Sequence, residues 1–274
     1  MGDLGGALLL IGAFVVFERR SAHPLLELSF FRSRRFSVAM SALALTIFAL
    51  SGAMFLLTQF FQFALGYSPL ATGLRITPIA AVLLVVAALS TTLARAVGTR
   101  VVVFVGMVLI SLGLALLSLV SVHSSYASML PAFMLLGVGT GLAVAPSTDS
   151  VMGSVPIDLA GVGSATNSTA LQVGSALGVA VLGSLLSTHY QATMTSLVAT
   201  RGVPSGIARV IEGSLGGALL AARRAGALGP SLALAARAAY VSAMIFAVDV
   251  GALIVGVAAI VVALALPARA EGDA

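Results

Sequence analysis

The sequence predicts an all-α membrane protein, a polytopic bundle of hydrophobic helices. Of its 274 residues, 59% are hydrophobic and only 8% are charged, and the mean hydropathy is +1.14. Soluble domains carry about 25% charged residues, so this chain has too little polar surface to cover a water-soluble globule. Its apolar residues also recur in long blocks from one end to the other. The whole chain is therefore expected in the bilayer.

Six apolar blocks are long enough to cross a membrane as helices. A hydrocarbon core about 30 Å thick requires about 20 residues at 1.5 Å each. The predicted spans are residues 38–63, 75–93, 101–121, 129–150, 163–186 and 239–266. An earlier apolar block at 4–17 would reach only about 21 Å, and we expect it to be a helix with its beginning missing.

Arginine residues predict the orientation, because basic residues in short loops stay on the cytoplasmic side. Arginines crowd the loop from Glu18 to Phe36, and Arg95 and Arg100 follow the second span, whereas the short connections on the opposite side, near Gly66 and His123, hold only Arg75 between them. The crowded loop and the C-terminus are therefore expected in the cytoplasm of a bacterial cell, beneath its plasma membrane.

Three parts follow from this orientation. They are a truncated transmembrane helix with a cytoplasmic Arg-rich linker at 1–37, a six-helix bundle at 38–266 with an extracytoplasmic loop at 187–238, and a cytoplasmic tail at 267–274. Within the long loop, apolar residues recur every four positions, opposite Arg209 and Glu212: Ile207, Ile211, Leu215 and Leu219. This spacing indicates an amphipathic helix at the membrane interface. An ordinary exposed connector is the alternative.

Several functional classes are not supported by the composition. There is no Cys, so neither disulfides nor thiolate chemistry is available. The three histidines lie singly between hydrophobic blocks, and we expect no metal or cofactor. The net charge of +5 comes from arginines that are not gathered on a soluble domain with aromatic stacking partners, so nucleic-acid binding is not expected. Without a nucleophile and base paired within a span, the sequence does not predict an enzyme.

Two spans carry polar stripes at helical spacing. In the first span the stripe contains Phe48, Ser51, Phe55, Gln59 and Gln62. In the fifth it contains Ser164, Ser168, Gln172 and Ser175, with Asn167 on the adjacent face. Facing lipid, such side chains would lack hydrogen-bond partners. They are therefore expected either to line a substrate cavity, with Phe55, Gln59, Gln62, Asn167 and Gln172 as candidates, or to hydrogen-bond between helices.

Asp249 is the clearest ionisable residue within a predicted span. A charge at the bilayer centre costs about 2.5–3.5 kcal/mol on insertion scales, so this carboxyl should be protonated, paired or facing water. It is a candidate functional residue. A neutral Asp bonded to a neighbouring helix is the alternative interpretation.

Two glycine pairs predict close helix packing. Gly137 and Gly141 are four residues apart, as are Gly174 and Gly178, so each pair lies on one helix face and lets a neighbour approach. The pairs also favour contact between their own two helices.

Three segments resemble a known transporter family. The segment FLLTQFFQFALGYSPLATGLRITP, residues 55–78, matches its signature at Gln59, Gln62, Gly66, Tyr67, Ser68, Pro69, Gly73, Leu74 and Pro78. The stretch from Leu135 to Leu186 and the segment HPLLELSFFRSRRFS, from His23 to Ser37, match as well. The chain resembles the C-terminal half of the fourteen-helix drug:proton antiporters of the major facilitator superfamily, the QacA and EmrB type.

The resemblance implies a six-helix half with one partial helix, exporting amphipathic drugs or other small molecules by proton-coupled alternating access. It implies a cytoplasmic gate loop at LARAVGTR, with Arg95, Gly98 and Arg100 as candidates, although this loop lacks the family's acidic residue. Asp249 becomes the proton-coupling candidate. The expected partners are the lipid bilayer, substrate, protons, and a missing N-terminal half or second copy. The alternative is a truncated, non-transporting remnant, or a bundle that associates with a full transporter.

Overall fold

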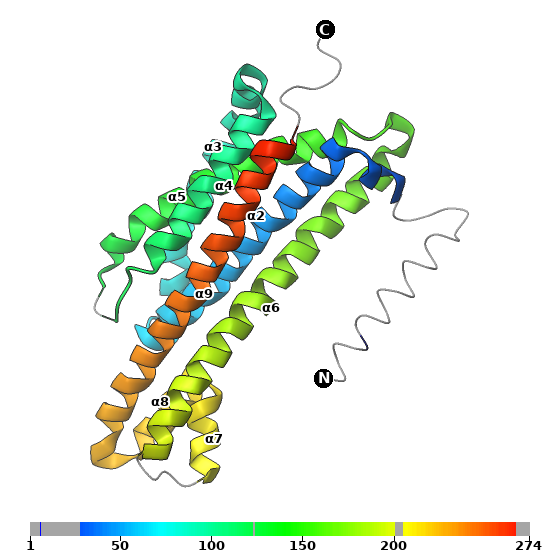
Figure 1. The fold of residues 1–274 in the computed structure, drawn as a ribbon. Coiled ribbons are helices and arrows are strands. Elements are labelled where there is room, and N and C mark those ends of the chain that lie inside the picture. The colour runs from blue at the N-terminus through cyan, green and yellow to red at the C-terminus, as the bar shows by residue number, and fades with distance from the viewer. Residues whose placement is uncertain (1–5, 7–27, 123, 201–204, 267–274) are drawn as a thin grey trace.

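The computed structural model describes residue 6 and residues 28–122, 124–200 and 205–266 (Figure 1). The described residues form helices and no strands, and six of the helical segments are long and apolar enough to cross a membrane. The prediction of an all-α polytopic membrane bundle is confirmed. The partial helix expected at 4–17 and the tail at 267–274 lie outside the described residues.

Five of the six spans are longer than predicted, because the helices continue into flanking polar residues. The long helices are α2 (Arg34–Gln59), α3 (Pro69–Val97), α4 (Thr99–Leu117), α5 (Tyr126–Met152), α6 (Ala160–Thr200) and α9 (Gly229–Ala265). A π-helical segment, η2 (Phe60–Ala64), extends α2, and short 3-10 helices lie at η1 (Leu28–Arg32), η3 (Ile157–Leu159) and η4 (Gly226–Leu228).

Serine caps determine where three of the spans begin. The hydroxyl oxygens of Ser33, Ser68 and Ser125 accept hydrogen bonds from backbone N–H groups three residues later, at 3.4, 3.2 and 3.4 Å. A serine in this position satisfies one of the free donors at a helix start. The first cap places Arg34 and Arg35 in the opening turn of α2, rather than in the loop predicted from Glu18 to Phe36.

Glycines allow the central helix, α5, to pack tightly on both sides. A Cβ added at Gly137 would lie 2.7 Å from the carbonyl oxygen of Ile79 on α3. A Cβ added at Gly139 would lie 2.5 Å from the carbonyl oxygen of Gly106 on α4. Only glycine permits such backbone contact, and in lipid this close packing replaces the hydrophobic effect as the attraction between helices.

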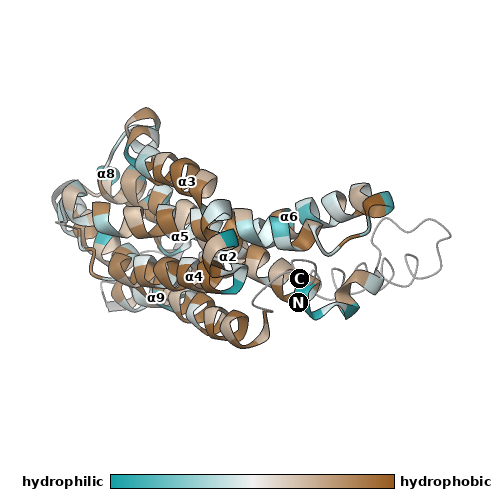
Figure 2. Cartoon of the chain, turned by 90° about the horizontal axis from the view of Figure 1, so that it is seen from above, coloured by the Kyte–Doolittle hydropathy of each residue, from teal (hydrophilic) through white to brown (hydrophobic). Residues whose placement is uncertain are grey.

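The helices form a bundle in which two spans, α3 and α6, are less buried by their neighbours than the others. α5 packs against α3 and α4, α2 against α6 and α5, and α9 against α4 and α6. α3 and α6 are the least buried spans, with 11% and 22% of their most apolar segments buried. Large apolar side chains are exposed along α3 and α9, for example Leu84 and Leu264. Figure 2 shows apolar residues over α3 and α4, and more polar residues along α6.

The segment predicted as an extracytoplasmic loop, 187–238, is largely helical. α6 and α9 extend into it from either side, and α7 (Ser205–Gly213) and α8 (Leu215–Arg224) lie between them. The predicted amphipathic helix is therefore two helices, because the hydroxyl of Ser214 caps α8. α7 packs against α6 and α8 against α9, and Ile211 and Leu215 are buried. The apolar face covers the ends of α6 and α9 instead of lying alone at the interface.

Candidate functional site

α2 and α6 meet backbone to backbone along what we call the α2–α6 seam, formed by Ala44, Phe48, Gly52 and Phe55 of α2 and Gly174, Gly178, Leu182 and Gly183 of α6. Gly174 lies directly against the backbone of Ala44, and Gly178 against that of Phe48. A Cβ at Gly52 would lie 3.0 Å from the carbonyl oxygen of Gly178. The two glycine pairs thus face different neighbours, α3 for Gly137 and Gly141 and α2 for Gly174 and Gly178, rather than each other.

Of the α2 candidates, Phe55 lies in this seam, whereas Gln62 belongs to η2, which packs against α3, α8 and α9. The ring of Phe55 packs on Gly183, where an added Cβ would lie 3.0 Å from a ring carbon. Gln59 and Gln62 are half-buried, the first at the end of α2 and the second in the π-helical segment. A π-helical turn changes the direction of the side chains that follow it, and such turns are frequent at functional sites.

The α6 candidates lie toward the other end of the seam. Gln172 is exposed and Asn167 is half-buried. The side-chain oxygen of Asn167 is buried and has no hydrogen-bond partner among the described residues. Sixteen residues separate Asn167 from Gly183, or about 24 Å along α6. The structure therefore does not bring the two groups of candidates into a single cluster.

Asp249 lies about midway along α9. It is exposed, and the exposed Phe246 and Leu253 lie one turn to either side of it. Among the described residues it has no hydrogen bond or ion pair. The hydrogen bond to a neighbouring helix that we considered for a neutral Asp249 does not occur among the described residues. The ring of His189 on α6 stacks on Phe246, with 5.1 Å between centroids.

The predicted gate loop is a turn of one residue. α3 ends at Val97 and α4 begins at Thr99, and Gly98 between them has φ +95° and ψ 140°, a conformation that side chains strongly disfavour. Arg95 is exposed and Arg100 is half-buried. Neither arginine pairs with a carboxylate among the described residues.

One cluster was missed by the sequence analysis, which used Arg75 only to compare the charges on the two sides of the membrane. The guanidinium of Arg75 lies 4.0 Å from the ring centroid of Tyr67 and 5.9 Å from that of Tyr126. The hydroxyl of Tyr126 donates to the carbonyl oxygen of Arg75 at 2.9 Å. Phe61 and Phe133 continue the aromatic contacts. The available signal was a lone arginine eight residues after a tyrosine, but the third member, Tyr126, is distant in sequence.

Both a family model and individual known proteins match this chain. The family model described as Major Facilitator Superfamily matches residues 4–179. The multidrug resistance protein Stp of Mycobacterium tuberculosis is 37% identical over 196 residues, covering 72% of this chain and 36% of that protein. The multidrug efflux pump LfrA of Mycolicibacterium smegmatis is 30% identical over 270 residues, covering 97% and 51%.

A third relative is named for resistance to one compound, tetracenomycin C, and for its export. The tetracenomycin C resistance and export protein of Streptomyces glaucescens is 31% identical over 189 residues, covering 69% of this chain and 35% of that protein. The chain spans about half the length, or less, of these three relatives.

Proposed function

Because the chain belongs to the Major Facilitator Superfamily, a family of transporters rather than enzymes, we propose that it forms one half of a secondary transporter that exports amphipathic drugs or other small molecules. Transporters of this kind hold their substrate near the bilayer midplane, between two six-helix halves. The relatives named as multidrug resistance and efflux proteins support this substrate class. A separate segment, another chain or a second copy would supply the complementary half.

The observation that carries the proposal is the polar face of α6. Ser164, Ser168 and Gln172 are exposed, although they belong to a span apolar enough to cross the membrane. Polar side chains facing lipid would lose their hydrogen bonds, so water, substrate or another protein surface should cover this face. A cavity between two halves provides that cover. The unpartnered side-chain oxygen of Asn167 supports the same interpretation.

We further propose that export is coupled to proton entry through alternating access, with Asp249 as the proton-binding group. Of the carboxylates in the described spans, Asp249 lies well inside its helix, whereas Asp149 lies three residues from the end of α5. Asp249 lies on the same face of α9 as Phe246, which stacks on His189 of α6, so its protonation would act on the packing of α9 against α6. This coupling would be conformational.

The plasma membrane remains the proposed location, with the C-terminus in the cytoplasm. The arginines of the short connections support this orientation, because Arg34 and Arg35 lie at the end of the bundle where α5 and α9 end, while the arginines of α7 and α8 belong to the long segment at the opposite end. Arg34 bonds the carbonyl oxygen of Leu264 near the end of α9, at 3.3 Å. Arg35 bonds the hydroxyl of Ser150 near the end of α5, at 3.1 Å. Basic residues at one end of a bundle are typical of its cytoplasmic side.

The test is efflux of a fluorescent cationic dye from vesicles energised by a proton gradient. The chain would be compared alone and co-expressed with a complementary six-helix half. We expect efflux only from the complemented pair, and its loss when the gradient is collapsed. If the pair is inactive but the chain alters efflux by an intact exporter, the associated-bundle alternative is supported. If neither effect occurs, the chain is a non-transporting remnant.

A further inference from the structure

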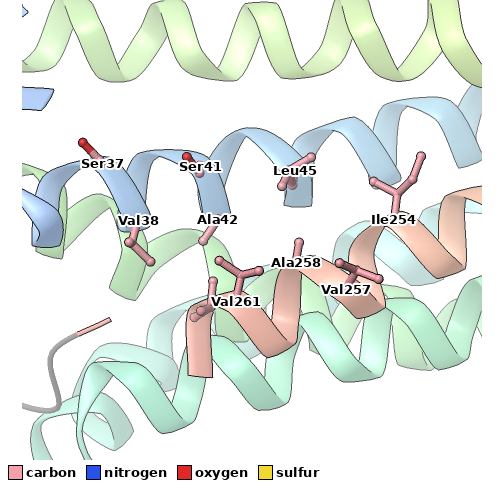
Figure 3. A pocket seen from close by; sticks show the side chains of 10 residues that line it. Ser37, Val38, Ser41, Ala42, Leu45, Ile254, Val257, Ala258 and Val261 are labelled. Atoms are coloured by element: carbon pink, nitrogen blue, oxygen red, sulfur yellow. The ribbon is translucent and has the colours of Figure 1, made fainter. Parts of the chain in front are cut away.

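A groove between α2 and α9 is separate from the α2–α6 seam. It has a volume of about 370 Å³ and is lined mainly by apolar side chains from both helices. Val38 and Ala42 contribute from α2, and Ala258 and Val261 from α9 (Figure 3). The lining residues extend over 37–45 and 254–262, each about 12 Å of helix. This length is close to one leaflet of a hydrocarbon core about 30 Å thick.

The lining offers few directional contacts for a polar ligand. Its polar members are Ser37 and Ser41, whose side chains point away from α9 in Figure 3. The hydroxyl of Ser37 already donates to the carbonyl oxygen of Phe31 at 2.6 Å. The occupant that fits such a surface is a hydrocarbon chain.

Positive charge lies at the end of the groove assigned to the cytoplasm. Arg34, one turn before Val38, spans the two helices by donating to the carbonyl oxygen of Leu264 at 3.3 Å. This bond uses one of the five N–H donors of the guanidinium. Arg32 is exposed at the end of η1. Neither arginine pairs with a carboxylate among the described residues.

We propose that this groove binds an anionic phospholipid of the inner leaflet, with an acyl chain between α2 and α9 and the phosphate at Arg34 and Arg32. Basic pockets between transmembrane helices on the cytoplasmic side bind anionic headgroups. Arginine also suits phosphate, because it forms strong charge-assisted hydrogen bonds. A bound lipid would fasten α2 to α9 at the cytoplasmic end, where Arg34 provides one hydrogen bond.

The test measures binding of phosphatidylglycerol and phosphatidylcholine to the delipidated chain in detergent by native mass spectrometry. We expect the anionic lipid to bind at least about fivefold more tightly, since each arginine near an anionic lipid contributes on that scale. Val261→Phe should fill the groove and weaken binding of both lipids. Arg34→Gln should remove the preference for phosphatidylglycerol and leave phosphatidylcholine binding unchanged.

Two matched variants control for general effects. Ile260→Phe adds the same ring at the adjacent exposed position of α9, which does not line the groove. Arg224→Gln removes one positive charge at the exposed end of α8. Both should bind phosphatidylglycerol like the unmodified chain. The proposal fails if Val261→Phe and Ile260→Phe have equal effects, if the two lipids bind equally, or if Arg224→Gln abolishes the preference as fully as Arg34→Gln does.

Discussion

The guanidinium of Arg75 stacks over the ring of Tyr67, 4.0 Å from its centroid. Tyr67 lies in the connection between η2 and α3, and Arg75 lies two turns into α3. The hydroxyl of Tyr126 holds the same turn of α3 against the start of α5. Arg75 thereby ties together three elements at the end of the bundle opposite Arg34.

A double-mutant cycle at these two residues should reveal coupling. Cation–π contacts contribute about 0.5–2 kcal/mol, so Tyr67→Leu and Arg75→Gln should each lower the free energy of unfolding by that order. The double variant should lose less than the sum of the two single losses. Tyr67→Phe keeps the ring and should behave like the unmodified chain. Thermal unfolding in detergent measures all four variants, and additive losses would contradict the stacking.

Gly178 should tolerate no side chain. Its contact with the backbone of Phe48 leaves no room for a methyl group, and overpacking costs about 1–3 kcal/mol. Gly178→Ala should therefore destabilise the bundle by that amount in denaturant unfolding.

Gly161→Ala is the matched control for this substitution, because it lies on the same helix with open space around it. Alanine favours a helix over glycine by up to about 1 kcal/mol. The control should be neutral or slightly stabilising. Equal destabilisation of both variants would mean that α2 and α6 do not approach as closely as the structure shows.

Gly98→Ala should destabilise the turn between α3 and α4. With φ at +95°, a side chain at this position is strained by about 1–3 kcal/mol. Gly73→Ala in α3 has open space and no positive φ, so it should be neutral. Protease cleavage at the turn, followed over time, would report the loss. Resistance equal to that of the unmodified chain would contradict the strained turn.

The lengths of the apolar blocks predicted the fold, because an apolar segment of about 20 residues crosses the bilayer as a helix. The ends of the spans were less predictable. Ser33 and Ser214 cap helices through local geometry that hydropathy does not register, and α6 continues to Thr200 because α7 packs against it.

The candidate site was predictable only in part. Helical spacing placed Phe55, Gln59 and Gln62 along one face, and the structure shows Phe55 packed against Gly183 of α6. Spacing within one helix could not show that Asn167 lies about 24 Å farther along the seam. It also could not show that Asp249 is exposed, because the exposed face of α9 depends on which sides α4 and α6 cover.

Asp249→Asn should uncouple transport while leaving the fold intact. The side chain is exposed and unpartnered among the described residues, so the amide should not lower the unfolding temperature. In the complemented transporter, dye efflux driven by a proton gradient should fall at least about tenfold, whereas downhill dye exchange without a gradient should continue. Unchanged gradient-driven efflux would remove Asp249 from the coupling mechanism.

The most direct test of the account is whether the polar face of α6 meets water inside the membrane. The chain contains no Cys, so single cysteines can be labelled with a membrane-impermeant maleimide. Gln172→Cys should react, and an exported drug should slow the reaction. Leu112→Cys, at an exposed apolar position of α4, should meet lipid and remain unlabelled. An unreactive Gln172→Cys, or one labelled at the same rate with and without drug, would contradict a transport cavity on this face.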